Sequence, residues 1–177
     1  MKTHLLGIGL GVLLGTSALG DTKDEARRIY SRLNGVPPSP SELESIAKLL
    51  DGDRLKEAAL LAIESAGGLF YNTKLRQLYS SWSNETRNAR GALNDFVATL
   101  IGLTRDEVPF NQALSGDLVW IVETDPAGGD ALPAYSLLDN THFMEVETRG
   151  IDLRRALVRR KQSQTTDLPE DATAGLL

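Results

Sequence analysis

The chain has 177 residues, the size of one ordinary domain, and it contains no cysteine. This absence excludes disulfides, a thiolate nucleophile, a cysteine-ligated metal and covalent haem attachment within these residues. The formal net charge of −5 gives no overall basic balance, so we expect no nucleic-acid partner.

The first 20 residues have the order of a secretory signal peptide. Lys2 precedes an apolar run over residues 5–14, and small residues follow that run. A transmembrane helix needs about 20 apolar residues, so the run is too short to span a bilayer comfortably. We expect cleavage after Gly20, with cleavage after Ala18 as the second choice and an uncleaved anchor as the alternative. The mature chain is then periplasmic or secreted and has no membrane association. It carries a net charge of −6, because Lys2 is the one charge removed from −5.

Capping signals divide the next part of the chain into three predicted helices, at Thr22 to Gly35, Ser39 to Gly52 and about Asp53 to Ala66. The first two begin with capping boxes, Thr-x-x-Glu and Ser-x-x-Glu, and end at glycines, and a Gly-Gly pair ends the third. Apolar residues recur at helical spacing, which predicts that each helix buries one face. In the third helix the residues expected to face inward are Leu55, Ala58, Ala59, Ala62 and Ile63.

A fourth helix is predicted over Leu69 to Leu78, and a loop carrying Trp82 is predicted over residues 80–91. The loop contains the glycosylation pattern Asn-Glu-Thr at residues 84–86, which is weak evidence by itself. The stretch LNDFVATLIGLTRDEVPF, residues 93–110, comes next. Its apolar residues recur at spacings of three and four, which predicts an amphipathic helix over residues 93–103.

Polar residues bracket that helix on both sides. Asp95 lies in its first turn, and Thr104-x-x-Glu107 has the pattern of a capping box for a short helix over residues 109–114. Helix capping therefore accounts for Asp95 and Glu107. It leaves three polar residues without a capping role, and we interpret them as candidates for a buried polar network or an interface: Asn94, Arg105 and Asp106.

The rest of the chain is less regular. Residues 117–123 form either a short strand or the buried end of a helix, residues 124–148 form a long loop, and a last helix runs from about Asp152 to Gln162. Residues 163–177 form a polar tail. The expected fold is therefore mostly α, a single helical domain over residues 21–162 with about six or seven helices and room for one short strand pair.

A few residues could carry chemistry. His142, the one histidine of the mature chain, and Met144 are the residues able to ligate haem iron, although a hydrogen-bonding histidine and a core methionine are the commoner roles. Trp82 could stack on a sugar or a haem edge, and its usual role is packing. Carboxylates including Asp117 could serve glycoside hydrolysis, but helix capping and pairing with Arg105 are simpler explanations for their presence. No metal site is expected, since a multi-histidine site cannot be built.

Several motifs together resemble known families. RIYSRLNGVPPSPSEL resembles the helix–Gly-x-Pro-Pro–helix opening of the cytochrome c-associated domains of planctomycetes. The segments FYN, WSNE, LNDFVATLIG, RDEVPF, LSGDLVW, AYS, NTHF and ATAGLL occur in the order found in a related family of uncharacterised proteobacterial exported proteins. Each motif is weak, and the ordered set covers nearly all of the mature chain.

In that family, as the resemblance implies, the chain continues into a part with a Cys-His haem motif of the cytochrome c kind. This sequence resembles the N-terminal part alone, so no cofactor is expected within it, and haem c is implied for the missing part only. The resemblance carries no established reaction with it.

Two functions from different classes follow. The first is a non-catalytic helical module of an exported cytochrome c-like redox protein, which packs against a C-terminal cytochrome-like domain or a redox partner and exposes an apolar patch when isolated. The second is a stand-alone periplasmic ligand-binding or carboxylate-dependent hydrolytic domain with a cleft. The interface or binding candidates are Trp82, Asn94, Arg105, Asp106, Asp117 and His142.

Overall fold

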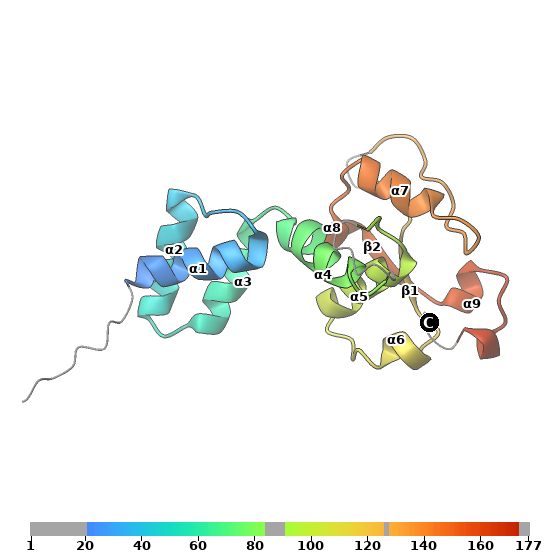
Figure 1. Cartoon of the computed structure of the whole chain (residues 1–177), viewed down its shortest axis with the longest axis horizontal. Helices are drawn as coiled ribbons and strands as arrows, with labels where there is room; N and C mark the ends of the chain where they lie inside the picture. The colour runs from blue at the N-terminus through green and yellow to red at the C-terminus, as the bar shows by residue number, and fades with distance from the viewer. Residues whose placement is uncertain (1–20, 84–90, 126–127, 174–177) are drawn as a thin grey trace, which may run out of the picture.

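The computed structural model describes residues 21–83, 91–125 and 128–173, and these form a mostly helical domain with one two-stranded antiparallel sheet (Figure 1). Five of the helices have eight or more residues, and the contiguous η1 and α4 together make a sixth long helical segment, so the predicted fold class is confirmed. The elements are α1 (Thr22–Asn34), α2 (Pro40–Asp51), α3 (Leu55–Ser65), η1 (Phe70–Leu75), α4 (Arg76–Ser80), α5 (Asp95–Arg105), α6 (Gln112–Ser115), β1 (Val119–Val122), α7 (Thr141–Thr148), α8 (Leu153–Ala156), β2 (Leu157–Arg160), α9 (Gln162–Thr165) and η2 (Glu170–Ala172).

The first three helices form a group of their own at the N-terminal end, and the helix formed by η1 and α4 joins this group, through η1, to the rest of the domain (Figure 1). The predicted capping box of α2 is present in full, with Ser39 and Glu42 bonded to each other's backbone amides. Gly35 ends α1 in a left-handed conformation with φ 78°, as predicted. The N-cap of α1 is Asp21, one residue before the predicted Thr22.

This N-terminal group has a core of small side chains. Its buried residues are Ala26, Tyr30, Ile46, Ala47, Ala58, Ala62 and Ala66. The inward position predicted for Leu55 is wrong, because 57% of that residue is exposed. Asp53 has φ 57°, so α3 begins only at Leu55, which lies at its solvent-facing first turn. Alanines at the contacts allow the helices to approach closely, which makes this core compact and nearly free of aromatic residues.

The second core surrounds α5 and the sheet. Residues Val97 to Leu103 are all buried, so α5 is covered on every side and is not the amphipathic surface helix that its spacing predicts. β1 is buried at all four positions and pairs with β2 in the register Val119 with Arg160 and Val122 with Leu157. The largest fully buried side chains here are Trp120, Phe143, Leu93 and Ile101.

The structure corrects three predictions for the second half of the chain. Residues 124–148 are not all loop, because Thr141–Thr148 form α7 with Phe143 and Val146 buried. The predicted last helix stops at Ala156, because residues 157–160 pair with β1 as a strand. Residues 163–173 are not a free tail, since they contain α9 and η2 and bury Thr173.

No helix in the described part of the chain is long and apolar enough to cross a membrane.

Candidate functional site

The two polar groups that bracket α5 lie at opposite ends of that helix and do different things. Asn94 is the N-cap, because its side chain accepts a hydrogen bond from the Val97 amide at 2.9 Å. Asp95 accepts a bond from the Phe96 amide at 2.8 Å and another from the Tyr135 hydroxyl at 3.2 Å. Asn94 therefore caps α5, whereas the sequence analysis interpreted it as a candidate for a buried polar network or an interface.

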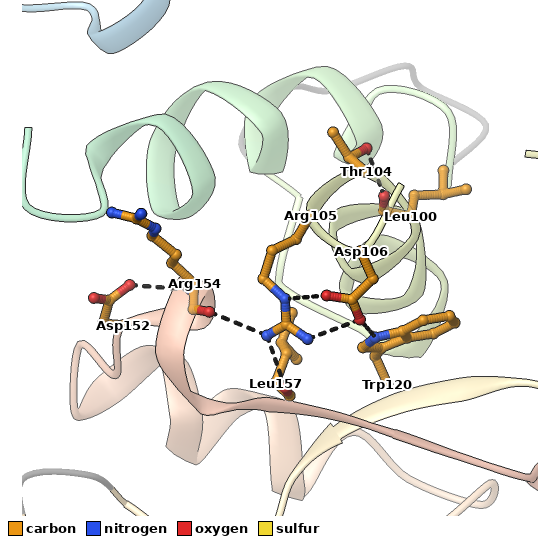
Figure 2. Close-up of polar contacts among 8 residues, drawn as sticks. All are labelled: Leu100, Thr104, Arg105, Asp106, Trp120, Asp152, Arg154 and Leu157. Atoms are coloured by element: carbon orange, nitrogen blue, oxygen red, sulfur yellow. Dashed lines mark hydrogen bonds and ion pairs between the residues drawn. The ribbon is translucent and has the colours of Figure 1, made fainter. Parts of the chain in front are cut away.

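Arg105 and Asp106 form a polar network at the other end of α5 (Figure 2). The guanidinium of Arg105 donates two bonds to the Asp106 carboxylate, at 2.6 and 2.9 Å. It also donates to the carbonyl oxygens of Arg154 at 3.1 Å and Leu157 at 2.7 Å. The side chains are 18% and 31% exposed, so this network ties α5 to the junction of α8 and β2 at the edge of the core.

Trp120 completes the network from the sheet. Its indole Nε1 donates to the Asp106 carboxylate at 2.8 Å (Figure 2). The guanidinium of Arg159 lies 5.7 Å from the indole ring. The bonds from Arg105, and then that from Trp120, hold the pKa of Asp106 below its usual value against the opposing effect of burial. The carboxylate therefore stays charged and keeps the Arg105 guanidinium aimed at the backbone carbonyls.

Glu107 does not cap a helix. Its φ is 54°, and the N-cap of α6 is Asn111, which makes no side-chain capping bond. Thr104 lies inside the last turn of α5, where its hydroxyl bonds the Leu100 carbonyl at 2.9 Å. The predicted capping box is therefore wrong, because α5 continues two residues beyond the predicted end.

The outward-facing backbone groups of the sheet explain why these polar side chains are needed. In an antiparallel pair, alternate residues turn their N–H and C=O groups away from the partner strand, and such groups must find other partners when buried. On β1, the amide of Trp120 donates to the Thr99 hydroxyl at 3.2 Å, and the amide of Val122 donates to the His142 ring at 3.3 Å. On β2, the carbonyl of Leu157 accepts from Arg105.

His142 therefore provides a hydrogen-bond acceptor for a backbone amide at the outer edge of the sheet. It is only 2% exposed and lies in α7, not in a loop. Its Nε2 accepts from Val122, and its Nδ1 lies 2.8 Å from the Pro133 carbonyl, which can only accept. This pattern requires the neutral ring with the proton on Nδ1. Both ring nitrogens are engaged, which leaves none for an iron atom.

Met144 is not brought to His142 as a second ligand. It is 57% exposed on α7, whereas His142 faces the core from two positions earlier, so the core packing expected of this methionine is wrong as well. No cluster of three or more potential metal-binding His, Asp or Glu residues occurs in the described ranges.

Asp117 holds the C-terminal segment. Its carboxylate accepts bonds from the amide and the hydroxyl of Ser163, at 2.8 and 2.6 Å. These bonds keep the pKa of Asp117 below its usual value, with the hydroxyl bond as the largest cause. The residue therefore positions α9 against β1.

Asp95 and Asp106 lie too far apart to act as a hydrolytic pair. Glycoside hydrolysis needs two carboxyl groups about 5 to 9.5 Å apart. Asp95 and Asp106 lie eleven positions apart on one helix, about 16 Å at 1.5 Å per residue, and both are engaged by the bonds given above.

A cavity of about 380 Å³ opens beside the N-terminus of α5. It is lined by both apolar and polar residues, among them Asn94, Asp95, Tyr135, Leu138 and Asp139. Burial, and then the neighbouring Asp95 carboxylate, raise the pKa of Tyr135. The hydroxyl therefore remains protonated and serves as a donor to Asp95, which closes the cavity wall.

Trp82 lies on the surface with a second aromatic residue. It is 58% exposed, and Phe110 is 47% exposed. Tyr79 lies between them, with ring centroids 5.3 Å from Trp82 and 6.2 Å from Phe110, and is itself 3% exposed. We call Trp82, Tyr79 and Phe110 the aromatic patch. The glycosylation pattern at residues 84–86 lies outside the described residues.

Sequence reasoning missed four residues on which the site depends: Thr99, Gly102, Trp120 and Tyr135. A Cβ atom on Gly102 would overlap the Trp120 ring, so only glycine allows the indole to lie against α5. A glycine inside a helical pattern costs about 1 kcal/mol relative to alanine, and that cost is a signal of close packing. A threonine between apolar residues in the same helix is a second signal, since its hydroxyl needs a partner when buried.

Comparison with known proteins gives no match to a family profile, to a curated protein or to a solved structure.

Proposed function

We propose that the chain is a non-catalytic helical module of an exported cytochrome c-like redox protein, and that its aromatic patch docks a cytochrome-like domain. The observation that carries the proposal is the exposure of Trp82 and Phe110 on either side of the buried Tyr79 ring. Exposed aromatic side chains that lie together on a surface are typical of protein interfaces, where tryptophan and tyrosine often dominate the binding energy. The nature of the partner comes from the family resemblance of the sequence.

The polar residues support a module without catalysis. Arg105 and His142 form hydrogen bonds with backbone groups, and Asp106 accepts bonds from Arg105 and Trp120. Asp117 accepts its bonds from Ser163. A catalytic acid or base needs a free position toward a substrate. The bonds that these residues make hold the fold together, which disfavours the hydrolytic alternative.

Export is part of the same proposal. Residues 1–20 have the pattern of a signal peptide, and Asp21 is the N-cap of α1. Cleavage after Gly20 would leave that cap in place. Determination of the N-terminus of the protein purified from its source tests this part, with Asp21 as the expected first residue and retained Met1 as the contrary result.

Docking is best tested by fluorescence. Haem quenches nearby tryptophan emission, so purified c-type cytochromes from the same source can be titrated one at a time into the mature protein. We expect saturable quenching with at least one of them. Trp82 lies on the proposed docking surface and provides the exposed reporter, whereas Trp120 is fully buried in the second core.

The matched control is the double variant Trp82→Ser, Phe110→Ser, with binding followed by calorimetry because the reporter is lost. Both residues are about half exposed, so the melting temperature should remain close to that of the parent while binding falls at least tenfold. Absence of binding by every cytochrome tested, or equal binding by the double variant, would refute the proposal.

A further inference from the structure

One imidazole ring joins three parts of the second core. We call residues 133–140, the irregular segment that leads into α7, the strap. The Nδ1 of His142 lies 2.8 Å from the Pro133 carbonyl, at the start of the strap, and its Nε2 accepts from the Val122 amide of β1 at 3.3 Å. His142 itself lies on α7, so its ring connects the strap, α7 and the sheet.

The strap packs loosely. Leu138 is 96% exposed and Leu137 is 40% exposed. Residues 135–138 line a cavity of about 380 Å³ together with the start of α5, and a second cavity of about 360 Å³ together with residues 165–168. Segments with few buried apolar contacts open at low free energy, so the attachment of the strap depends on its polar contacts.

Two of those polar contacts use groups that keep their protons near neutral pH. The Tyr135 hydroxyl donates to the Asp95 carboxylate at 3.2 Å, and the Asn140 side-chain amide donates to the Leu93 carbonyl at 2.7 Å. Burial, and then the Asp95 carboxylate, raise the pKa of Tyr135, so its hydroxyl stays a donor. The ring of His142 is different, because histidine changes its charge between about pH 5 and pH 8.

Protonation removes the acceptor that the closed strap needs. Both nitrogens of a charged imidazole carry protons, so Nε2–H would face the N–H of Val122. The closed form therefore holds the neutral ring, whereas a released histidine ring takes up a proton with its ordinary pKa of about 6.5. The closed form binds fewer protons than the open form, so its stability is present above about pH 6.5 and falls as the pH falls. Each pH unit below that value favours the open form by up to about tenfold, which gives about 30-fold at pH 5.

No neighbouring carboxylate is bonded to the ring within the described residues. The rings of Tyr135 and Phe143 lie against it, with centroids 6.2 and 4.8 Å away, and Asp95 bonds the Tyr135 hydroxyl. The other carboxylates on the elements around the ring are bonded elsewhere, Glu123 to Arg160, Asp139 to Thr141, Glu145 to Arg149 and Glu147 to Arg76. The closed arrangement therefore offers the charged ring no anionic partner.

We infer that His142 is an acid-sensitive switch whose protonation releases the strap from the sheet. The proton is taken up in the open form, so the buried ring needs no path to solvent in the closed form. Because residues 135–138 line both cavities, release of the strap would join them into one groove. The inference does not depend on the cytochrome partner, since it uses different residues and a different surface.

Amide hydrogen exchange followed by NMR tests the switch in the purified protein. Protection factors are measured at pH 7 and pH 5, which corrects for the dependence of intrinsic exchange on pH. We expect the protection factor of the Val122 amide to fall at least tenfold at pH 5. The Trp120 amide on the same strand donates to Thr99, which does not titrate, and its protection factor should change less than about twofold.

His142→Gln is the matched control. A glutamine amide offers one acceptor for the Val122 amide and one donor for the Pro133 carbonyl, and it does not titrate. Its Val122 amide should be equally protected at pH 7 and pH 5. His4, which lies outside the described residues, is present in both proteins and cannot cause a difference between them.

Three results would overturn the inference. The first is a Val122 protection factor that is the same at both pH values in the parent. The second is an equal fall in His142→Gln. The third is a joint fall for Val122 and Trp120, which would mean that acid unfolds the whole core and does not release the strap. If His142→Gln fails to fold, the His142 ring signals of the parent decide, because titration of the ring without loss of Val122 protection contradicts the switch.

Discussion

The two hydrophobic cores of the molecule are built in different ways. The N-terminal core joins three consecutive helices, α1 to α3, through alanine-rich contacts. The second core joins α5 to β1, β2 and α7, elements that lie up to about 60 positions apart in the chain, and it contains the large buried rings of Trp120 and Phe143. In Figure 1 the first group lies apart from the second and meets it through the helix formed by η1 and α4.

The cores also differ in which residues provide hydrogen-bond partners for the backbone N–H and C=O groups. In the N-terminal core the helix ends are capped by neighbours in sequence, as in the capping box of Ser39 and Glu42, and by one distant side chain, Asn34, which donates to the Ala62 carbonyl at 2.8 Å. In the second core the buried groups of the sheet are closed by the distant side chains Thr99, Arg105 and His142. The polar residues that resemble a functional site in the sequence therefore supply hydrogen-bond partners to backbone groups that a sheet of only two strands would otherwise leave buried and unpaired.

The largest expected effect contrasts a buried glycine of the second core with an exposed glycine at the end of α2. Gly102→Ala should lower the free energy of unfolding by about 3 kcal/mol, because the new methyl group overlaps the buried Trp120 ring. Gly52→Ala, at the end of α2, should change it by less than about 0.5 kcal/mol, because the added atom makes only ordinary contacts and φ is −90°. Urea denaturation measures both, and equal effects would contradict the difference between the cores.

A smaller loss is expected from Arg105→Ala. The change leaves the carbonyls of Arg154 and Leu157 without this donor and removes the partner of Asp106, which should cost about 2 kcal/mol. Arg155→Ala removes an arginine that is 79% exposed and should cost less than about 0.5 kcal/mol. An unchanged melting temperature for Arg105→Ala would show that the network does not support the fold.

His142→Phe should cost about 1 to 2 kcal/mol. Phenylalanine can occupy the buried space but offers no acceptor to the Val122 amide and no donor to the Pro133 carbonyl. The same bonds predict that nitrogen NMR of the parent finds the ring proton on Nδ1. A ring with its proton on Nε2 would be incompatible with the bond from Val122.

The smallest expected effect concerns pH. Because the pKa of Asp106 is lowered in the folded state, its contribution to stability is present above the unfolded value of about 3.9 and is lost as pH falls through the lowered folded value. Asp106→Asn should therefore reduce the loss of stability below about pH 4. Melting temperatures of both proteins between pH 2 and pH 6 would reveal this, and parallel curves would show that Asp106 contributes nothing to acid sensitivity.

The N-terminal half of the fold could be read from the sequence because its signals are local. The capping box at Ser39 and the left-handed Gly35 act within a few residues, and both are present as predicted. The glycosylation pattern at residues 84–86 and the signal-peptide pattern at residues 1–20 lie outside the described residues and stay predictions.

The second half could not be read in the same way because its contacts are distant. Residues 157–160 follow a helical pattern and become a strand only because β1 offers a partner 35 or more positions earlier. Arg105 and Asp106 were singled out together by their position after the helix predicted over residues 93–103. Their connection to Trp120 and Leu157 depends on the tertiary fold, which no local pattern encodes.

The central claim is that distant side chains close the edges of the sheet, and amide hydrogen exchange tests it most directly. In the parent protein the amides of Trp120 and Val122 should be as protected as that of Ile121, which lies between them on the strand. Thr99→Val should release Trp120 selectively, and His142→Phe should release Val122 selectively. If each amide keeps its protection in both variants, or exchanges freely in the parent, then Thr99 and His142 do not close the sheet and the account is wrong.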